Sequence, residues 1–177
     1  FDETAVDFLE SLDAPCYKIA SYENTDLPLI RKAAATRKPL IISTGMASVT
    51  ELGEAVEAAR EAGCRDLILL KCTSTYPATP ENTNIATIPH MRALFGCETG
   101  LSDHTMGIGV SVAAVALGAT VVEKHFTTDR ALPGPDHGFS ADPAEFAAYV
   151  ATVRAVEKML GSADKVPTAA EQAVRLN

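Results

Sequence analysis

Several features that define particular protein classes are missing from this 177-residue sequence. Its four cysteines form no CxxC pair and all lie in or beside apolar runs. We therefore interpret them as reduced, buried thiols rather than as zinc ligands or disulfide partners. No apolar run reaches the ~18 residues of a membrane-spanning helix, and the first residues do not form a signal peptide. These absences predict a cytoplasmic protein without a membrane partner.

Positive charge is also scarce. Fifteen lysines and arginines face 23 aspartates and glutamates, for a net charge of −8, which argues against nucleic acid as a partner. A small anionic substrate remains compatible with this balance, because a local cluster of lysine and serine can bind one. The 47% hydrophobic and 21% charged content is typical of a folded domain with one core.

Apolar runs alternate with amphipathic segments along the chain. Strands are predicted at residues 16–20, 39–44, 66–73, 100–103 and 121–126. Helices are predicted at residues 4–12, 27–36, 49–62, 88–95, 107–118 and 143–160. Loops at 74–85 and 127–142 and a polar tail after residue 161 complete the pattern. Strict alternation implies an α/β fold in which right-handed crossovers join parallel strands, with helices covering the continuous apolar strands.

Two architectures fit this pattern, a (β/α)8 barrel and a five-stranded doubly wound sheet. Five strands cannot close an eight-stranded barrel, so the barrel interpretation requires three further strands before Phe1. The sequence begins inside a predicted strand-to-helix turn, which agrees with a partial barrel. An open barrel is expected to expose apolar strand edges and to associate through them.

Each of the five predicted strands ends in polar side chains, although burying unpaired polar groups is costly. In both architectures function gathers at the carboxyl ends of the strands. Lys18 lies inside an apolar strand, where it is either a lysine that snorkels to the surface or an anion ligand, and we favour the ligand. Ser21 and Ser43 would singly be cap or turn residues, but together with Lys18 they form a plausible phosphate cradle.

Two histidines, His104 and His125, follow the last two predicted strands. A single buried histidine is more often a core residue, but two at matching positions predict a divalent metal site with open positions for substrate. We expect His90 to be structural or exposed, and the role of His137 stays open. The rigid segment 133–136 presents Asp136; turn chemistry explains its glycine and prolines, but not the length of the loop.

Six motifs in order give the chain a resemblance to a known family. They are Tyr17-Lys18-Ile19-Ala20-Ser21, Ile42-Ser43-Thr44-Gly45-Met46, Cys72-Thr73-Ser74-Thr75-Tyr76-Pro77, Ser102-Asp103-His104-Thr105, Glu123-Lys124-His125-Phe126-Thr127 and Gly134-Pro135-Asp136. With these motifs the chain resembles the sialic acid synthases, the phosphoenolpyruvate-condensing synthases of N-acetylneuraminic, legionaminic and pseudaminic acids. The resemblance covers nearly the whole chain.

The resemblance implies that residues 1–161 are the C-terminal part of a catalytic (β/α)8 barrel, with strands four to eight. Residues 162–177 would then be a linker toward an antifreeze-like (SAF) domain outside this sequence. In the family, the first three strands supply an acidic residue, a lysine and a threonine, and the antifreeze-like domain donates an arginine to the partner subunit's site. We therefore expect a homodimer of the full-length protein, and no activity from these 177 residues alone.

The resemblance also assigns roles to the polar strand ends. His104 and His125 match the protein ligands of a divalent metal, most often Mn²⁺, with Mg²⁺ or Co²⁺ as alternatives. The matches to phosphoenolpyruvate contacts are Lys18, Ser21, Ser43, Ser74 and Ser102. The matches to catalytic residues around the sugar are Tyr76, Glu123 and Asp136. Many family members have asparagine at position 74, and serine has a shorter reach.

The implied reaction is the metal-dependent condensation of phosphoenolpyruvate with an N-acylated amino sugar aldehyde, giving a nine-carbon 2-keto acid and phosphate. The run 71–78 is most similar to pseudaminic acid synthases and 134–137 to the sialic and legionaminic branches, and we favour pseudaminic acid. Two other functions stay open. One is a barrel aldolase that forms a Schiff base on Lys18 or Lys71, and the other is a sugar-binding relative without catalysis.

Overall fold

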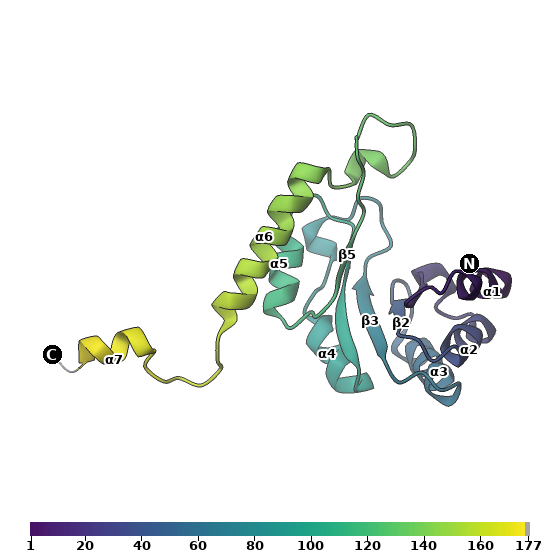
Figure 1. The fold of residues 1–177 in the computed structure, drawn as a ribbon, viewed down its shortest axis with the longest axis horizontal. Coiled ribbons are helices and arrows are strands. Elements are labelled where there is room, and N and C mark those ends of the chain that lie inside the picture. The colour runs from purple at the N-terminus through teal and green to yellow at the C-terminus, as the bar shows by residue number, and fades with distance from the viewer. Residues whose placement is uncertain (176–177) are drawn as a thin grey trace.

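Five parallel strands in consecutive order form the sheet at the centre of the computed structural model, which describes residues 1–175 (Figure 1). The strands are β1 (Tyr17–Ile19), β2 (Leu40–Ser43), β3 (Leu67–Cys72), β4 (Glu98–Asp103) and β5 (Val122–Lys124). All four neighbouring pairs are parallel and in continuous register. The predicted strands are thereby confirmed, with boundaries that differ by one or two residues.

Helices connect the strands in strict alternation. They are α1 (Glu3–Ser11), α2 (Leu27–Ala35), α3 (Val49–Glu61), α4 (Thr87–Phe95), α5 (Gly109–Ala116), α6 (Pro143–Leu160) and α7 (Ala169–Arg175). Short 3₁₀ turns are η1 (Ser21–Glu23), η2 (Pro80–Asn82) and η3 (His137–Phe139). The last two lie inside the predicted loops, and the six predicted helices are confirmed as α1 to α6.

The sheet is curled rather than flat. Lys18 on β1 and Glu123 on β5 lie on the two outermost strands, yet Lys18 Nζ is 3.5 Å from Glu123 Oε2. In a flat sheet four strand spacings would separate β1 from β5 by roughly 19 Å, farther than these two side chains can bridge. The consecutive strand order also excludes a doubly wound sheet, in which the order reverses at a switch point. The molecule is therefore a partial (β/α)8 barrel.

Strand alternation separates an outer face from an inner face. Tyr17, Ile19, Leu40 and Ile42 belong to the main core cluster together with the apolar sides of α2 and α3. Ile41, which alternates with them, points to the inner face and is only half-buried. A smaller cluster joins α4, β4 and α5. The helices thus cover one face of the sheet, and the side chains between the core positions line the inside of the curl.

The C-terminal segment stands apart from the sheet. An extended stretch after α6 leads to α7, and α7 buries no side chain (Figure 1). This short helix lies in the tail for which no helix was predicted. A capping box at its start explains it: the Thr168 amide donates to Glu171 Oε2 at 2.7 Å, and the Glu171 amide donates to Thr168 Oγ1 at 3.3 Å. The role of 162–177 as an interdomain linker stays a prediction.

No helix within residues 1–175 combines the length and the apolar character that crossing a bilayer requires.

Gly100 on β4 lies too close to the segment that leads into β5 to carry a side chain. A Cβ atom at this position would lie 2.0 Å from the carbonyl oxygen of Val121 and 2.8 Å from Cδ2 of Leu70. Because one obstacle is backbone on the neighbouring chain segment, no side-chain rotation relieves the clash. Glycine here permits the close pairing of β4 with the start of β5, and so the approach of the two histidines that follow these strands.

We expect Gly100→Ala to lower the free energy of unfolding by about 1–3 kcal/mol, the cost typical of overpacking. The matched control is Gly53→Ala, because a Cβ on that glycine of α3 meets nothing within 4 Å. The control should be neutral or stabilise by about 0.5–1 kcal/mol. Urea unfolding followed by circular dichroism measures both. A Gly100→Ala protein as stable as the parent would contradict the assigned contact.

Candidate active site

The inner face of the curl brings the predicted site residues to one end of the sheet. His104 directly follows β4, and His125 directly follows β5. Ser102 and Glu123 lie two residues earlier on the same strands and are register partners. Side chains two apart on a strand point to the same face. The carboxyl ends of β4 and β5 thereby present four predicted site residues side by side.

The two imidazole rings lie 5.2 Å apart, centroid to centroid, with their planes inclined by 65°. His104 is buried, and its Nδ1 lies 2.9 Å from the carbonyl oxygen of Thr73. A carbonyl oxygen only accepts, so Nδ1 carries the hydrogen, and in the neutral ring the lone pair is on Nε2. This is the arrangement that prepares a histidine for metal binding, because the second nitrogen fixes the tautomer and the ring orientation.

The pKa values of the two histidines shift in opposite directions. Burial lowers the pKa of His125, and the neighbouring His104 lowers it further. Burial also acts to lower the pKa of His104, but Cys72 and the Thr73 carbonyl outweigh burial, so the pKa rises. The environment therefore favours neutral His125 while His104 retains its proton to higher pH.

Cys72 is a member of the site that was not predicted as one. Its thiol is buried at the end of β3. Burial acts to raise the pKa of this thiol, but His104, Ser21 and Ser74 together overcome burial and lower the pKa to about 7. The sequence predicted only a reduced, buried cysteine. Its inward direction follows from the register of β3, which was not available from the sequence.

Aromatic rings enclose the histidines. The Tyr76 ring lies 4.2 Å from the His104 ring, and the Phe139 ring lies 5.1 Å from the His125 ring. Tyr76 and Phe139 are themselves 5.9 Å apart. Tyr76 was a predicted site residue, whereas Phe139 was missed. The one sequence feature that pointed to Phe139 as a site residue is its place in the long loop that follows His125.

The loop after β5 is held together by its own hydrogen bonds and carries Asp136 toward His125. Asp136 Oδ2 lies 3.8 Å from His125 Nδ1, and Ser140 Oγ donates to the Asp136 carbonyl at 2.6 Å. His137 forms a hydrogen bond within the loop, because its Nδ1 lies 2.7 Å from Thr127 Oγ1. The loop is therefore a fixed support for the Asp136 carboxylate.

Glu123 joins both sides of the site. One carboxylate oxygen accepts from Ser102 Oγ at 2.6 Å, and the other lies 3.5 Å from Lys18 Nζ. The Lys18 ammonium also donates to the Ile19 carbonyl at 3.3 Å. Lys18 thus points into the mouth and is paired with a carboxylate there. Its role as an anion ligand stays a prediction.

Small hydroxyl groups surround Gly45 just beyond β2. A Cβ at Gly45 would lie 2.2 Å from Ser74 Oγ and 2.8 Å from Ser21 Oγ. The Gly45 amide donates to Ser21 Oγ at 3.1 Å. The Ser43 hydroxyl is buried without a hydrogen-bond partner in the structure. Glycine thus leaves room for Ser21 and Ser74, two predicted substrate-binding serines. The Ser43 hydroxyl can still form a hydrogen bond.

Lys71, one of the two candidate Schiff-base lysines, lies on the opposite face of β3. It lines a cavity of about 300 Å³ between β3 and helices α3 and α4, together with Leu52, His90 and Met91. Its Nζ donates to the Cys72 carbonyl at 2.8 Å and to Thr73 Oγ1 at 3.2 Å. Burial lowers its pKa. His90 is exposed, as expected, and neither residue faces the mouth.

Within residues 1–175, no group of three or more histidine, cysteine, aspartate or glutamate side chains is placed to hold a metal ion. The imidazoles of His104 and His125 lie side by side at the mouth, and the Asp136 carboxylate lies 3.8 Å from His125 Nδ1. A metal site built on the two histidines stays a prediction. A metal held by two imidazoles keeps several coordination positions for water and substrate.

The molecule is thus a partial (β/α)8 barrel that carries an imidazole pair and a lysine–carboxylate–serine cluster at the carboxyl ends of its strands. Residues 1–165 match the model of the NeuB family. The chain belongs to this family.

Relatives with established names agree with that assignment. The N,N'-diacetyllegionaminic acid synthase of Legionella pneumophila is 42% identical over 179 residues, covering 99% of this chain and 50% of that protein. The pseudaminic acid synthase of Helicobacter pylori is 43% identical over 161 residues, covering 91% and 47%. The solved N-acetylneuraminic acid synthetase of Leptospira borgpetersenii superposes with a TM-score of 0.93 at 34% identity, covering 99% and 61%. The chain spans about half the length of the curated relatives that it matches.

The expectation of four buried thiols is wrong for Cys16, which is exposed, and Cys97 is only partly buried, so Cys64 and Cys72 are the buried cysteines. We expect Cys72 to react with iodoacetamide at lower pH than Cys64, with half-maximal labelling near pH 7 because its pKa is about 7. Cys64 is the matched comparison, since Cys72 is 4% exposed and Cys64 5%, and burial raises the pKa of Cys64. Peptide mass spectrometry of the folded protein across a pH series measures both. Cys72 labelling that follows the Cys64 profile would contradict the proposed environment.

Proposed function

We propose that this chain forms one half of the active site of a synthase that condenses phosphoenolpyruvate with an N-acylated amino sugar aldehyde, giving a nine-carbon 2-keto acid and phosphate. The observation that carries the proposal is the imidazole pair at consecutive strand ends, directly beside the cluster of Lys18, Glu123 and Ser102. The named relatives that make legionaminic and pseudaminic acids support the same reaction class.

The proposed cofactor is a divalent metal, most often Mn²⁺ in this family, with Mg²⁺ or Co²⁺ as alternatives. The donor set fits such an ion, since His104 has its Nδ1 fixed on a carbonyl and burial disfavours protonated His125. The bound ion would supply Lewis-acid polarisation of the sugar aldehyde. His104 and His125 would hold it, and the two-ligand set would leave room for the aldehyde oxygen.

Phosphoenolpyruvate is proposed to bind where Lys18 and the serines converge. Its phosphoryl group would take Lys18 away from Glu123, exchanging a 3.5 Å ion pair for charge-assisted hydrogen bonds. Ser21 and Ser74, which crowd Gly45, are placed to donate hydroxyl hydrogen bonds. The unpartnered hydroxyl of Ser43 would gain an acceptor, and Ser102 would contribute from β4.

The sugar is proposed to lie between the histidines and the loop after β5. Tyr76 would pack against one face of it, because its ring already lies against His104. Asp136, next to His125, would orient the aldehyde or a hydroxyl, and Glu123 would accept from another hydroxyl. C3 of phosphoenolpyruvate would then attack the aldehyde carbon, and the aldehyde oxygen would take up a proton to become a hydroxyl. Water would add at C2 and lose its protons, and phosphate would leave with the electrons of the C2–O bond, so that a ketone remains at C2. Positioning two substrates in this way supplies much of the rate enhancement.

Pseudaminic acid is the proposed product, because the motif at residues 71–78 is most similar to that of pseudaminic acid synthases. The identities to pseudaminic and legionaminic synthases, 43% and 42%, do not separate the two branches. Turnover assays with competing N-acyl hexoses would decide between them.

The homodimer, the cytoplasmic location and the inactivity of these 177 residues alone are parts of the same proposal. Activity of the isolated chain would contradict the last of these.

Loss of either histidine should strongly weaken metal binding. In the longest natural polypeptide that contains this chain, we expect His104→Ala and His125→Ala each to weaken Mn²⁺ binding and turnover by more than about 100-fold, since changes to supporting residues alone cost 10- to 100-fold. His90→Ala is the matched control, because His90 is exposed and lines a different cavity. Calorimetry and phosphate release measure the effects. Retained binding in both site variants would overturn the proposal.

Chelation and imine trapping separate the metal mechanism from a Schiff-base aldolase. We expect EDTA to remove activity and Mn²⁺ to restore it. Borohydride reduction with a keto acid should leave Lys18 and Lys71 unmodified, because the Lys18 ammonium is paired with Glu123 and Lys71 lies behind β3. Tryptic mass spectrometry detects the adduct. A labelled lysine together with EDTA-resistant activity would favour the aldolase instead.

A further inference from the structure

A buried ion pair lies directly behind the two histidines. Asp103 immediately precedes His104, and Lys124 immediately precedes His125, and the two charged residues are register partners on β4 and β5. Lys124 Nζ lies 3.1 Å from Asp103 Oδ2, with side-chain exposures of 6% and 0%. Because side chains alternate along a strand, the histidines point into the mouth and the ion pair points toward the helices.

The Asp103 carboxylate has its hydrogen-bonding capacity filled. One oxygen accepts from the Thr105 amide at 2.9 Å and from Thr105 Oγ1 at 2.7 Å. The other accepts from Ser111 Oγ on α5 at 2.5 Å and from Lys124. Together these four bonds tie the carboxylate to three parts of the chain: the turn after β4, helix α5 and strand β5.

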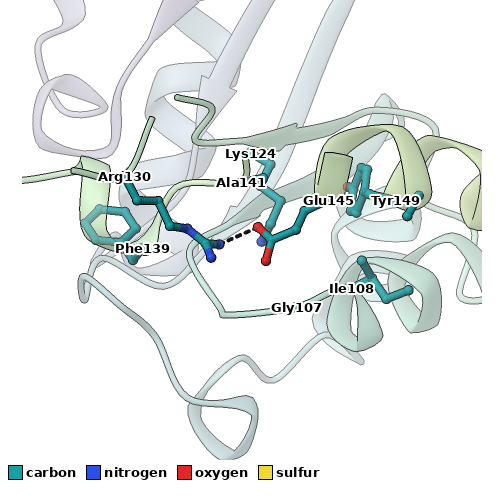
Figure 2. Close-up of a pocket in the computed structure, with 9 residues that line it drawn as sticks. Gly107, Ile108, Lys124, Arg130, Phe139, Ala141, Glu145 and Tyr149 are labelled. Atoms are coloured by element: carbon teal, nitrogen blue, oxygen red, sulfur yellow. Dashed lines mark hydrogen bonds and ion pairs between the residues drawn. The ribbon is translucent and has the colours of Figure 1, made fainter. Parts of the chain in front are cut away.

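The same network closes around the backbone of His104. Asp103 and Thr105 are bonded to each other across His104, and Lys124 Nζ also donates to the Thr105 carbonyl at 2.7 Å. Asp103 and Thr105, which flank His104, are thus both bound to Lys124, the residue that precedes His125. Lys124 also forms part of the wall of the cavity of about 140 Å³ between α5, α6 and the loop after β5 (Figure 2).

Stability alone is a poor explanation for this pair. Burying two charges costs several kcal/mol per ion before their attraction repays it, and apolar residues of similar volume often serve stability as well or better. A buried ion pair whose hydrogen bonds are all made is held in one arrangement, because moving either partner away leaves an uncompensated charge. The backbone next to this pair carries His104 and His125, so the pair also restricts the positions of these two histidines.

We infer that Asp103 and Lys124 are positioning residues that set the separation and direction of the His104 and His125 imidazoles, and through them the affinity of the site for a divalent ion. This inference rests on the proposed function, in which the two histidines hold a metal. Lys124 and Asp103 act through the backbone at the ends of β4 and β5, and neither touches the ion. A network on the outer face of the sheet thereby controls the chemistry on the inner face.

The test measures Mn²⁺ affinity by calorimetry and the melting temperature of the metal-free protein, in the longest natural polypeptide that contains this chain. We expect Lys124→Met and Asp103→Asn each to weaken Mn²⁺ binding about tenfold or more, the range of supporting residues around metal ligands. The double variant should lose about as much as either single variant, because the pair acts as a unit. Ser111→Ala keeps the test decisive if the charge variants do not fold. It removes one hydrogen bond to Asp103, and we expect it to weaken Mn²⁺ binding about two- to fivefold.

Lys38→Met is the matched control. Lys38 pairs with Glu10 at 2.9 Å and Asp13 at 3.2 Å and precedes β2, at the end of the sheet away from the histidines. It should lower the melting temperature without changing Mn²⁺ affinity. If the folded Asp103, Lys124 and Ser111 variants behave like this control, or if the losses in the double variant multiply, the inference is wrong. Unchanged Mn²⁺ binding in His104→Ala and His125→Ala would instead overturn the proposed function.

Discussion

The curl of the parallel sheet is the constraint on which the rest of the molecule depends. Because the strands pair in consecutive order and the sheet bends, the first and last strands come close enough for Lys18 to approach Glu123. A flat sheet with the same pairing would leave the two side chains on opposite edges. The curl also defines an inside, so every second residue at the strand ends points to a shared space, and every other one packs under the helices.

Polar groups occur on both sides of this sheet, but their states differ. On the helix side, the Asp103 carboxylate is fully bonded and Lys124 is matched to it. On the mouth side, bonding is incomplete or exchangeable: the Ser43 hydroxyl has no partner in the structure, and Lys18 and Glu123 sit at 3.5 Å. The contrast holds for these residues and not for the whole helix side, where the buried Thr99 hydroxyl also has no partner in the structure.

The mouth combines segments that are far apart in the sequence. The turn after β3 supplies Tyr76, and the loop after β5 supplies Asp136 and Phe139, and their rings and carboxylate meet around the histidines. The loop can do this without a helix or strand through most of its length because His137 and Ser140 bond it to itself.

Local sequence patterns were enough to predict the alternation of helices and strands, because continuous apolar runs and amphipathic segments have different periods. They also predicted the polar strand ends and the matching places of His104 and His125. The choice between a barrel and a doubly wound sheet needed the folded structure, since both share this alternation and differ in strand order. The folded structure also decided the directions of side chains: Lys18 points inward and Lys71 outward, and Cys72 and Phe139 join the site. Direction depends on strand register and curl, which arise from contacts between distant segments that no local pattern encodes.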